Sequence, residues 1–326
     1  MKTRVLGKSG VHVSEVGLGC WQLGGDFGPL GDDRAQAILR SAYEEGIRFW
    51  DTADVYGSGQ SELRIAEFLR SSGAESFVTT KVGRSPAIYP DGYTKQNVRK
   101  SIEGSAARLN VDCIDLVQLH CVPPQILKAG DIIGWMEDFQ AEGLIRYFGA
   151  SVETIEEARV AAKSPALVSL QIIFNIFRQN AISELFPLTE ANNVGIIVRL
   201  PLASGVLGGK MTRDRKFAES DHRHYNRHGE AFSVGETFSG IPFETALNLV
   251  EELKPLVPAG MTMAQMAMRW ILDYPAVTTV IAGASRPEQV LENASASSLR
   301  PLPEALHRKL AEIYVRDVEP ALLVTV

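Results

Sequence analysis

The sequence predicts a (β/α)8 TIM barrel for this chain of 326 residues, and three observations support that fold class. Short apolar runs alternate with longer amphipathic segments from one end of the chain to the other, as in repeated βα units around a parallel sheet. Eight such apolar runs occur, the number that closes a barrel. No linker, low-complexity tract or internal repeat divides the chain. We therefore expect one domain that spans residues 1–326.

The strand candidates are rich in β-branched residues and are bounded by glycine or polar turns, which is typical of buried parallel strands. They cover residues 15–19, 47–51, 77–81, 114–120, 144–151, 168–174, 195–200 and 277–282. Amphipathic segments between them predict helices, for example over residues 33–45, 62–70, 95–109 and 154–163. Strands that alternate with helices in this way require right-handed crossovers.

Some parts of the chain fall outside the eightfold pattern. Residues 1–14 predict a small N-terminal β-hairpin with its turn at Ser9 and Gly10. Helical patterns over residues 241–257 and 303–316 predict two extra helices. Residues 203–240 form a polar stretch that is too long for an ordinary βα loop.

Composition and charge disfavour several kinds of partner. The chain is 45% hydrophobic and 22% charged, and its formal net charge of −6 gives no overall attraction for nucleic acid or anionic lipid. The opening residues lack the apolar core of a signal peptide, and no apolar run approaches the ~20 residues of a membrane span. Cys20, Cys113 and Cys121 form no C-x-x-C pair. We expect a cytoplasmic protein without a membrane or nucleic-acid partner, and its oligomeric state stays open.

Four side chains with acid–base chemistry are predicted at one end of the barrel. Asp51, Lys81 and His120 end the second, third and fourth strand candidates, and Tyr56 follows Asp51 in the loop DTADVYG. In barrels of this type the reactive groups lie at the carboxyl ends of the strands. Each residue alone has an ordinary explanation, as a helix cap, a solvated tip or a structural hydrogen-bonding group. Their joint placement favours a catalytic site.

These four residues suit proton donation to a carbonyl oxygen. A free tyrosine has a pKa of about 10, and a neighbouring ammonium group lowers the pKa of the phenol. Lys81 supplies that charge, Asp51 holds Lys81, and His120 hydrogen-bonds the substrate oxygen. A general acid of this kind typically contributes ~10²–10⁴-fold in rate. The hydride has to come from a cofactor, because no side chain carries one.

Several sequence blocks resemble the aldo-keto reductases, in particular their bacterial and potassium-channel β-subunit-like branch. The blocks are LGKSGVHVSEVGLGCWQLGG, FWDTADVYG, the TTK that ends at Lys81, LVQLH, GASVETI, PLASGVLGGK and GASRPEQVLENA, in order between residues 2 and 296. The resemblance implies that Asp51, Tyr56, Lys81 and His120 form the family's catalytic tetrad, with Tyr56 as the acid. The channel subunits commonly lack the histidine, so His120 favours a working reductase.

The resemblance also implies a nicotinamide cofactor that lies extended across the barrel mouth. A Rossmann domain is disfavoured, because Gly17 and Gly19 are not followed by the third glycine of G-x-G-x-x-G. Ser285 and Arg286 precede a predicted short helix over residues 287–293. A helix N-terminus beside a guanidinium is a suitable binding site for a 2′-phosphate, which favours NADP(H) over NADH. The implied cofactor-binding residues are Trp21, Asp51, Ser151, Gln171, Leu200, Pro201, Leu202, Ser204, Lys210, Gly283, Ser285, Arg286, Gln289, Glu292 and Asn293.

Two positions depart from the family's pattern. Val152 stands where an asparagine often helps to hold the carboxamide, and Arg199 stands where an aromatic residue often stacks on the nicotinamide. A planar guanidinium can also stack, but it adds positive charge beside the ring. These changes put the cofactor's geometry and affinity in question and leave the functional class intact.

Other residues have both a functional and a structural interpretation. Trp21, Tyr56, Tyr89 and Cys121 are candidates for the substrate pocket, although Trp21 also suits a core position and Tyr89 suits loop packing. Cys121 next to His120 suggests a thiolate nucleophile, which we disfavour. The run MTMAQMAM at 261–268 suggests a soft binding face and better fits a helix with buried methionines.

The polar stretch contains three histidines among several arginines, which suggests either a metal site or a mobile flap. They are His222, His224 and His228. Interleaved cations and the lack of nearby thiolates argue against a metal, and we predict none. A flap over the cofactor or over a phosphorylated substrate and a solvated loop remain as equal alternatives.

The leading functional prediction is an NADPH-dependent oxidoreductase that reduces an aldehyde or ketone to an alcohol. A cofactor-sensing binding protein is a second hypothesis, kept open by Val152 and Arg199. A metal-dependent hydrolase or an aldolase is a third, in which Lys81 forms a Schiff base. That third hypothesis leaves the adjacent Asp51 and Tyr56 unexplained. The sequence does not identify the carbonyl substrate.

Overall fold

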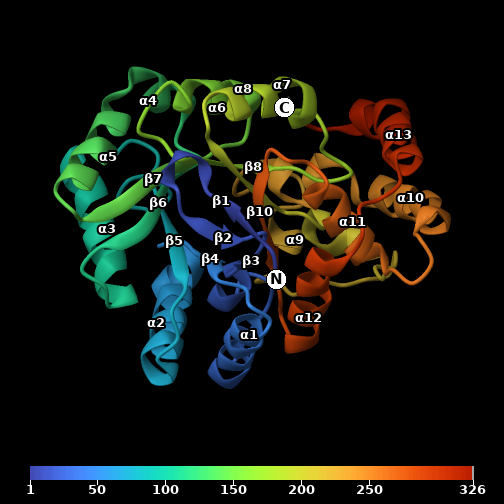
Figure 1. Cartoon of the computed structure of the whole chain (residues 1–326), viewed down its shortest axis with the longest axis horizontal. Coiled ribbons are helices and arrows are strands. Elements are labelled where there is room, and N and C mark those ends of the chain that lie inside the picture. The colour runs from blue at the N-terminus through green and yellow to red at the C-terminus, as the bar shows by residue number, and fades with distance from the viewer. Residues whose placement is uncertain (325–326) are drawn as a thin grey trace.

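The computed structural model describes residues 1–324, and in them eight parallel strands close into a barrel in the order β10-β3-β4-β5-β6-β7-β8-β9. Figure 1 shows these strands surrounded by helices, which confirms the predicted TIM barrel. The barrel strands are β3 (Val16–Gly19), β4 (Phe49–Asp51), β5 (Phe77–Val82), β6 (Ile114–His120), β7 (Ile145–Ser151), β8 (Ser169–Ile173), β9 (Gly195–Arg199) and β10 (Val277–Gly283). Each of the eight predicted runs coincides with one of these strands to within two residues at either end.

The helices follow the amphipathic segments of the sequence. The predicted helix over 95–109 is α3 (Lys95–Leu109), which begins where the Thr94 side chain accepts a hydrogen bond from the Asn97 N–H at 3.2 Å. The other α-helices are α1 (Asp32–Glu44), α2 (Gln60–Ser72), α4 (Pro124–Ala129), α5 (Asp131–Ala141), α6 (Ile155–Ala161), α7 (Ala181–Glu184), α8 (Phe186–Ala191), α9 (His222–Tyr225), α10 (Phe243–Leu253), α11 (Met263–Leu272), α12 (Pro287–Ser295) and α13 (Glu304–Ile313). Helices α10 and α13 are the two predicted extra helices.

The predicted hairpin consists of β1 (Thr3–Val5) and β2 (His12–Ser14), which pair antiparallel. Gly10 follows a short 3₁₀ turn and has a left-handed φ of 71°, which a glycine adopts without strain. Leu6 and Val13 are buried against barrel residues such as Phe49 and Leu116. Figure 1 shows β1 and β2 lying across the barrel strands. The hairpin therefore closes the end of the barrel away from the predicted site.

The methionine-rich run forms a buried helix. Every residue of α11 except Gln265 is buried, and Trp270 on this helix stacks on Phe174 with 4.9 Å between ring centroids. Thr262 and Gln265 form a capping box at its start, and an N-cap residue of this kind typically stabilises a helix by ~1 kcal/mol. The structural interpretation of the run is thus confirmed.

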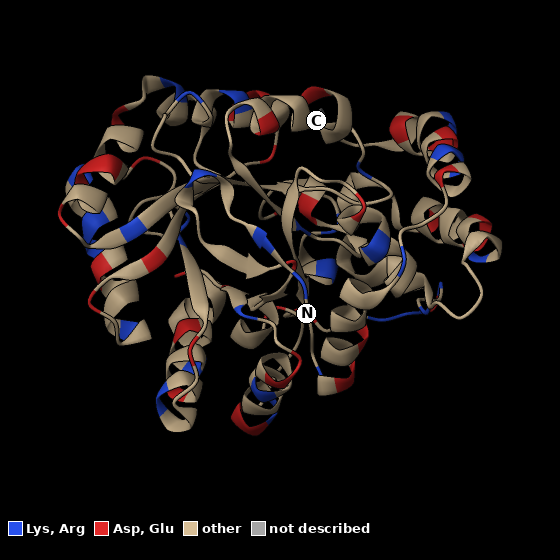
Figure 2. Cartoon of the chain, in the orientation of Figure 1, with Lys and Arg blue, Asp and Glu red and all other residues tan. Residues whose placement is uncertain are grey.

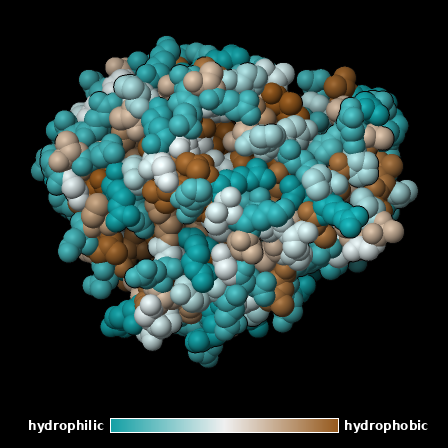
Figure 3. Space-filling view, viewed as in Figure 1, coloured by the Kyte–Doolittle hydropathy of each residue, from teal (hydrophilic) through white to brown (hydrophobic). Residues whose placement is uncertain are grey.

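Charged residues lie mainly on the outer helices, and the inner strands are largely uncharged (Figure 2). Figure 3 shows a face that is mostly hydrophilic, with apolar residues in scattered groups. Among residues 1–324, no helix combines the length and the apolar character that a membrane crossing requires.

Candidate active site

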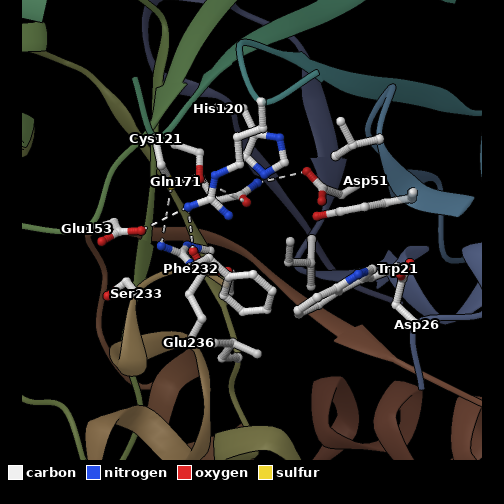
Figure 4. Close-up of a pocket in the computed structure, with 18 of the residues that line it drawn as sticks. Trp21, Asp26, Asp51, His120, Cys121, Glu153, Gln171, Phe232, Ser233 and Glu236 are labelled. Carbon is white, nitrogen blue, oxygen red and sulfur yellow. Dashed lines mark hydrogen bonds and ion pairs between the residues drawn. The ribbon is translucent and has the colours of Figure 1, made fainter. Parts of the chain in front are cut away.

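A hollow of about 530 Å³ opens at the carboxyl ends of the barrel strands. Six strands contribute their last residue to its lining, namely Gly19, Asp51, His120, Ser151, Arg199 and Gly283. Tyr56 and Gln171 line it as well, as do Trp21 and Phe232, which lie next to each other in Figure 4. The structure thus brings the predicted catalytic residues to one cavity, with Lys81 buried directly behind its wall.

Lys81 connects the residues of this group. Its side chain is 1% exposed and forms an ion pair with Asp51. The ammonium group also donates to the Thr52 carbonyl oxygen at 2.9 Å and contacts the Tyr56 hydroxyl at 3.2 Å. An ammonium group has three donors, and these three partners account for all of them. The position of the Tyr56 hydroxyl is thereby tied to that of Asp51.

The second carboxylate oxygen of Asp51 is held by two amide side chains. Gln118 donates to it at 3.0 Å and Gln171 donates to it at 2.7 Å. The two amides also contact each other at 3.2 Å, and Gln118 donates to the Thr79 hydroxyl. Hydrogen bonds of this kind stabilise the charged carboxylate in a buried position. Gln171 was expected to contact a cofactor. Gln118 was not predicted, although a glutamine within an apolar strand is a visible signal in the sequence.

The pKa of Tyr56 corrects one expectation. Burial raises the pKa of this phenol to about 12, although the Lys81 ammonium lowers it and Asp51 opposes Lys81. The predicted net decrease in the pKa of Tyr56 is therefore wrong. Removal from water destabilises the phenolate more than the Lys81 ammonium, which is already paired with Asp51, stabilises it. Tyr56 is thus protonated at neutral pH, as a proton donor has to be.

His120 faces Tyr56 edge to face, with 6.0 Å between ring centroids. Burial lowers the pKa of His120 well below its ordinary value, and the nearby charges of Arg84, Lys81 and Arg199 lower it further. The imidazole is therefore neutral. Its Nδ1 is buried without a hydrogen-bond partner in the part of the chain that the structure describes. A neutral imidazole has one donor nitrogen and one acceptor nitrogen, which suits contact with a carbonyl or hydroxyl oxygen.

Opposite Asp51, a cluster of arginine and glutamate side chains lines the hollow, and we call it the ion cluster. It consists of Arg84, Glu153, Arg199 and Glu236. Arg84 pairs with Glu153 at 2.9 Å and with Glu236 at 2.7 Å, and Arg199 lies 3.6 Å from Glu236. Burial alone would raise the pKa of Glu236, but Arg84 and Arg199 hold it at about 2. Of this cluster, sequence reasoning had singled out Arg199 alone.

Aromatic side chains form the remaining wall. Trp21 is half-buried and stacks on Tyr56 with 5.8 Å between ring centroids, so its pocket assignment fits better than a core position. The imidazole of His222 lies 4.7 Å from Trp21 and 4.4 Å from Phe27, and Phe232 lies 6.0 Å from Trp21. His222 and Phe232 both come from the long stretch 203–240. The second half of this stretch therefore folds over the mouth of the barrel, which favours a flap over a solvated loop.

The other chemical interpretations of these residues are weaker in the structure. Burial raises the pKa of Cys121 to about 11, so this thiol is protonated and is a poor nucleophile. His222 is enclosed by aromatic rings. Within residues 1–324, the one close cluster of metal-type ligands is Cys121, Glu153 and Glu236, which contains none of the three histidines. Both glutamates of that cluster are paired with Arg84.

The expected cofactor-binding residues fall into three groups. The first lines the hollow and consists of Trp21, Asp51, Ser151, Gln171, Leu200, Pro201 and Gly283. Ser285 and Arg286 line a second hollow of about 640 Å³, which shares Gln22 and Phe27 with the first. Of the remainder, Ser204 and Asn293 are buried, Leu202, Gln289 and Glu292 are half-buried, and Lys210 is exposed.

The start of α12 has the expected form. Ser285 donates through its backbone N–H to Gln289 at 2.8 Å, and Pro287 is the first residue of the helix. The Arg286 side chain is 60% exposed and lies 3.8 Å from Glu288, so its guanidinium is accessible from solvent. The helix N-terminus and this guanidinium together provide positive potential.

The family model for the aldo/keto reductase family matches residues 15–315. The chain belongs to the aldo/keto reductase family. It is 30% identical to a probable voltage-gated potassium channel subunit beta from Oryza sativa subsp. japonica, over 93% of each chain. It is 28% identical to the NADH-specific methylglyoxal reductase of Escherichia coli, covering 94% of this chain and 100% of that protein. The holo form of the aldo-keto reductase AKR11C1 from Bacillus halodurans superposes with a TM-score of 0.76 at 28% identity, covering 96% of each chain. As a member of this family, the chain is an oxidoreductase that acts on carbonyl compounds.

Proposed function

We propose that this aldo/keto reductase reduces an aldehyde or ketone to an alcohol, with NADPH as hydride donor and Tyr56 as proton donor. The observation that supports this most directly is the hydrogen bonding of Lys81, whose ammonium group joins Asp51, the Thr52 carbonyl and the Tyr56 hydroxyl behind the floor of the hollow. Tyr56 and His120 then present two polar groups to one oxygen atom of a substrate.

The protein's residues handle the proton in this reaction. NADPH, when bound, supplies the hydride that reduces the carbonyl carbon. The Tyr56 hydroxyl gives its proton to the carbonyl oxygen, and the resulting phenolate is stabilised by Lys81 at 3.2 Å. Asp51 and its two glutamine partners keep Lys81 charged and in place. Neutral His120 hydrogen-bonds the same oxygen, and water reprotonates Tyr56 afterwards.

The residues of the site fit such a cofactor. His120 Nδ1 and Arg199 Nε are buried polar atoms of the hollow without partners among residues 1–324. Arg286 and the start of α12 offer charge and backbone N–H groups to a 2′-phosphate, which supports NADPH over NADH. The residues that would hold the cofactor are those that line the two connected hollows.

We also infer that the chain works as one catalytic domain on a small carbonyl substrate. The lining of the hollow runs from Gly19 to Gly283, so almost the whole chain is needed to build it. Cys20, Cys113 and Cys121 are free thiols, which agrees with a reducing compartment such as the cytoplasm.

The test is a Tyr56→Phe substitution in the full-length protein, assayed with NADPH and a panel of simple aldehydes by loss of cofactor absorbance. We expect the rate to fall by about 10²-fold or more, because the proton donor is lost while the ring remains. NADPH affinity should change little. Tyr89→Phe is the matched control, because Tyr89 lines the same hollow but is 51% exposed, and the Lys81 ammonium bonds to Asp51, Thr52 and Tyr56 instead. Equal rates in the Tyr56 variant and the native protein would contradict the proposal.

A further inference from the structure

Arg199 reaches across the floor of the hollow. It is the last residue of β9, and its Nη2 donates to the Val152 carbonyl oxygen just beyond β7 at 3.1 Å. Because β8 lies between β7 and β9 in the barrel, the guanidinium spans β8, whose middle residue Gln171 pairs with Ser151 at the end of β7. Arg199 Nη2 also approaches the Cys121 sulfur at 3.7 Å. The Arg199 side chain is 10% exposed.

At least one donor of this guanidinium is unused. Arg199 Nε is buried and has no hydrogen-bond partner among the residues described. The Glu236 carboxylate lies 3.6 Å from Nη1, too far for a good hydrogen bond. An unpaired buried donor costs free energy, because its lost hydrogen bond to water is not replaced. A buried, charged and incompletely paired group in the floor of a cavity points to contact with a ligand.

The proposed function implies which ligand group enters this part of the hollow, and this inference rests on that function. A hydride donor has to approach the carbonyl carbon to ~3–3.5 Å. The carbonyl oxygen is held at Tyr56 and His120, so the nicotinamide has to enter the same hollow. Arg199 lies close enough to His120 to influence its charge, and it lines the same cavity. The nicotinamide ring carries a positive charge when oxidised and none when reduced.

We propose that Arg199 sets the preference between the two cofactor forms, so that the protein binds reduced NADPH more tightly than oxidised NADP⁺. A guanidinium is charged at any physiological pH and repels a positively charged ring. Its unpaired Nε–H is available to a carboxamide or another acceptor in either form, so the discrimination arises from charge. Such a bias favours loading of the reduced cofactor and release of the oxidised cofactor.

The charges around Arg199 decide how strong the repulsion is. Glu236 lies 3.6 Å away and offsets part of the positive charge, but it also pairs with Arg84 at 2.7 Å. Glu153 also pairs with Arg84, at 2.9 Å. Burial and the charge of Glu236 raise the pKa of Glu153. Two arginines are therefore balanced by one fully charged glutamate and one that is more easily protonated. Removal of Arg199 and removal of Glu236 should have opposite effects on cofactor preference.

The experiment measures the dissociation constants of NADPH and NADP⁺ separately, by isothermal titration calorimetry, for the native protein and three variants. Arg199→Gln removes the charge. We expect the ratio of the NADP⁺ dissociation constant to the NADPH dissociation constant to fall by about tenfold, a modest effect for two unit charges in one cavity. Arg199→Lys keeps the charge and loses the planar donors, so it should retain most of the ratio. Glu236→Gln removes a countercharge and should increase the ratio.

The outcomes separate this inference from the proposed function. If the native protein binds neither cofactor form, both the proposed function and this inference are wrong. If both forms bind but Arg199→Gln leaves their ratio unchanged, only the role of Arg199 is overturned. A change of the ratio in the same direction for Arg199→Gln and Glu236→Gln would also overturn it. Near-ultraviolet circular dichroism checks that each variant is folded. If Arg199→Gln does not fold, Arg199→Lys and Glu236→Gln still test the inference.

Discussion

At the scale of single residues, burial controls the chemistry of this site more than any one charge does. The Tyr56 phenol and the His120 imidazole are both kept neutral, because burial raises the pKa of the first to about 12 and lowers that of the second. Lys81 stays charged because its three hydrogen-bond donors are all occupied. The site thus holds one protonated acid beside one fixed cation.

His222 gives a prediction about pH at the same scale. Burial among aromatic rings lowers its pKa to about 4, whereas an unfolded chain takes up this proton near pH ~6.5. The unfolded or open state therefore binds more protons between these values, and stability falls as the pH drops from ~6.5 to ~4. The contribution of this histidine amounts to up to about 3 kcal/mol.

We expect His222→Gln to flatten this part of the stability profile, measured by chemical denaturation at a series of pH values. Hydrogen exchange of residues 221–240 over the same range shows whether the flap opens first. His12→Gln serves as control, because His12 is exposed on the hairpin. An unchanged slope in the His222 variant would show that another group is responsible.

At the scale of elements, strand ends and loops combine to form the site. The proposed catalytic residues come from β4, β5, β6 and the turn after β4, whereas the ion cluster joins the ends of β5, β7 and β9 to the flap. The strands were predictable because their apolar runs are short and sharply bounded. The flap's fold was not, because residues 203–240 have no regular hydrophobic period and are positioned by contacts with Trp21 and Arg84.

The start of helix α12 leads to a prediction about the preference for NADPH over NADH. Arg286→Ala removes the accessible guanidinium at its start, and we expect NADPH affinity to fall about tenfold relative to NADH, because a charge-assisted phosphate contact is lost. Titration of both cofactors against the variant measures this change. Arg308→Ala on α13 is the control, since Arg308 is exposed and pairs with Glu304 within its own helix. An equal loss for NADPH and NADH would argue against a 2′-phosphate site at Arg286.

At the scale of the whole molecule, the two ends of the barrel have separate roles. The hairpin β1–β2 lies across the barrel strands (Figure 1). Its apolar packing closes one end of the barrel, and the hollow occupies the other. The two ends are separated by the buried side chains inside the barrel. Stability and catalysis should therefore respond to different substitutions.

Leu6→Ala tests this separation. Leu6 is fully buried at the closed end, and a leucine truncated in such a place typically costs ~2–5 kcal/mol of unfolding free energy. We expect a lower thermal midpoint with an unchanged KM for cofactor and substrate. Val5→Ala, at a neighbouring position that is 43% exposed, should have a small effect on both. A large rise in KM in the Leu6 variant would mean that the hairpin also shapes the site.

The sequence by itself determined the eight strands, the closing hairpin, and the placement of Asp51, Tyr56, Lys81 and His120 at one end, because these follow from local periodicity and from the rule that parallel strands end together. Tertiary structure alone decided which groups surround them. Gln171 meets Asp51 across 120 residues of sequence, and Arg84 meets Glu236 across 152. The pKa of Tyr56 was likewise beyond the sequence, because desolvation depends on how completely distant segments exclude water from one hydroxyl group.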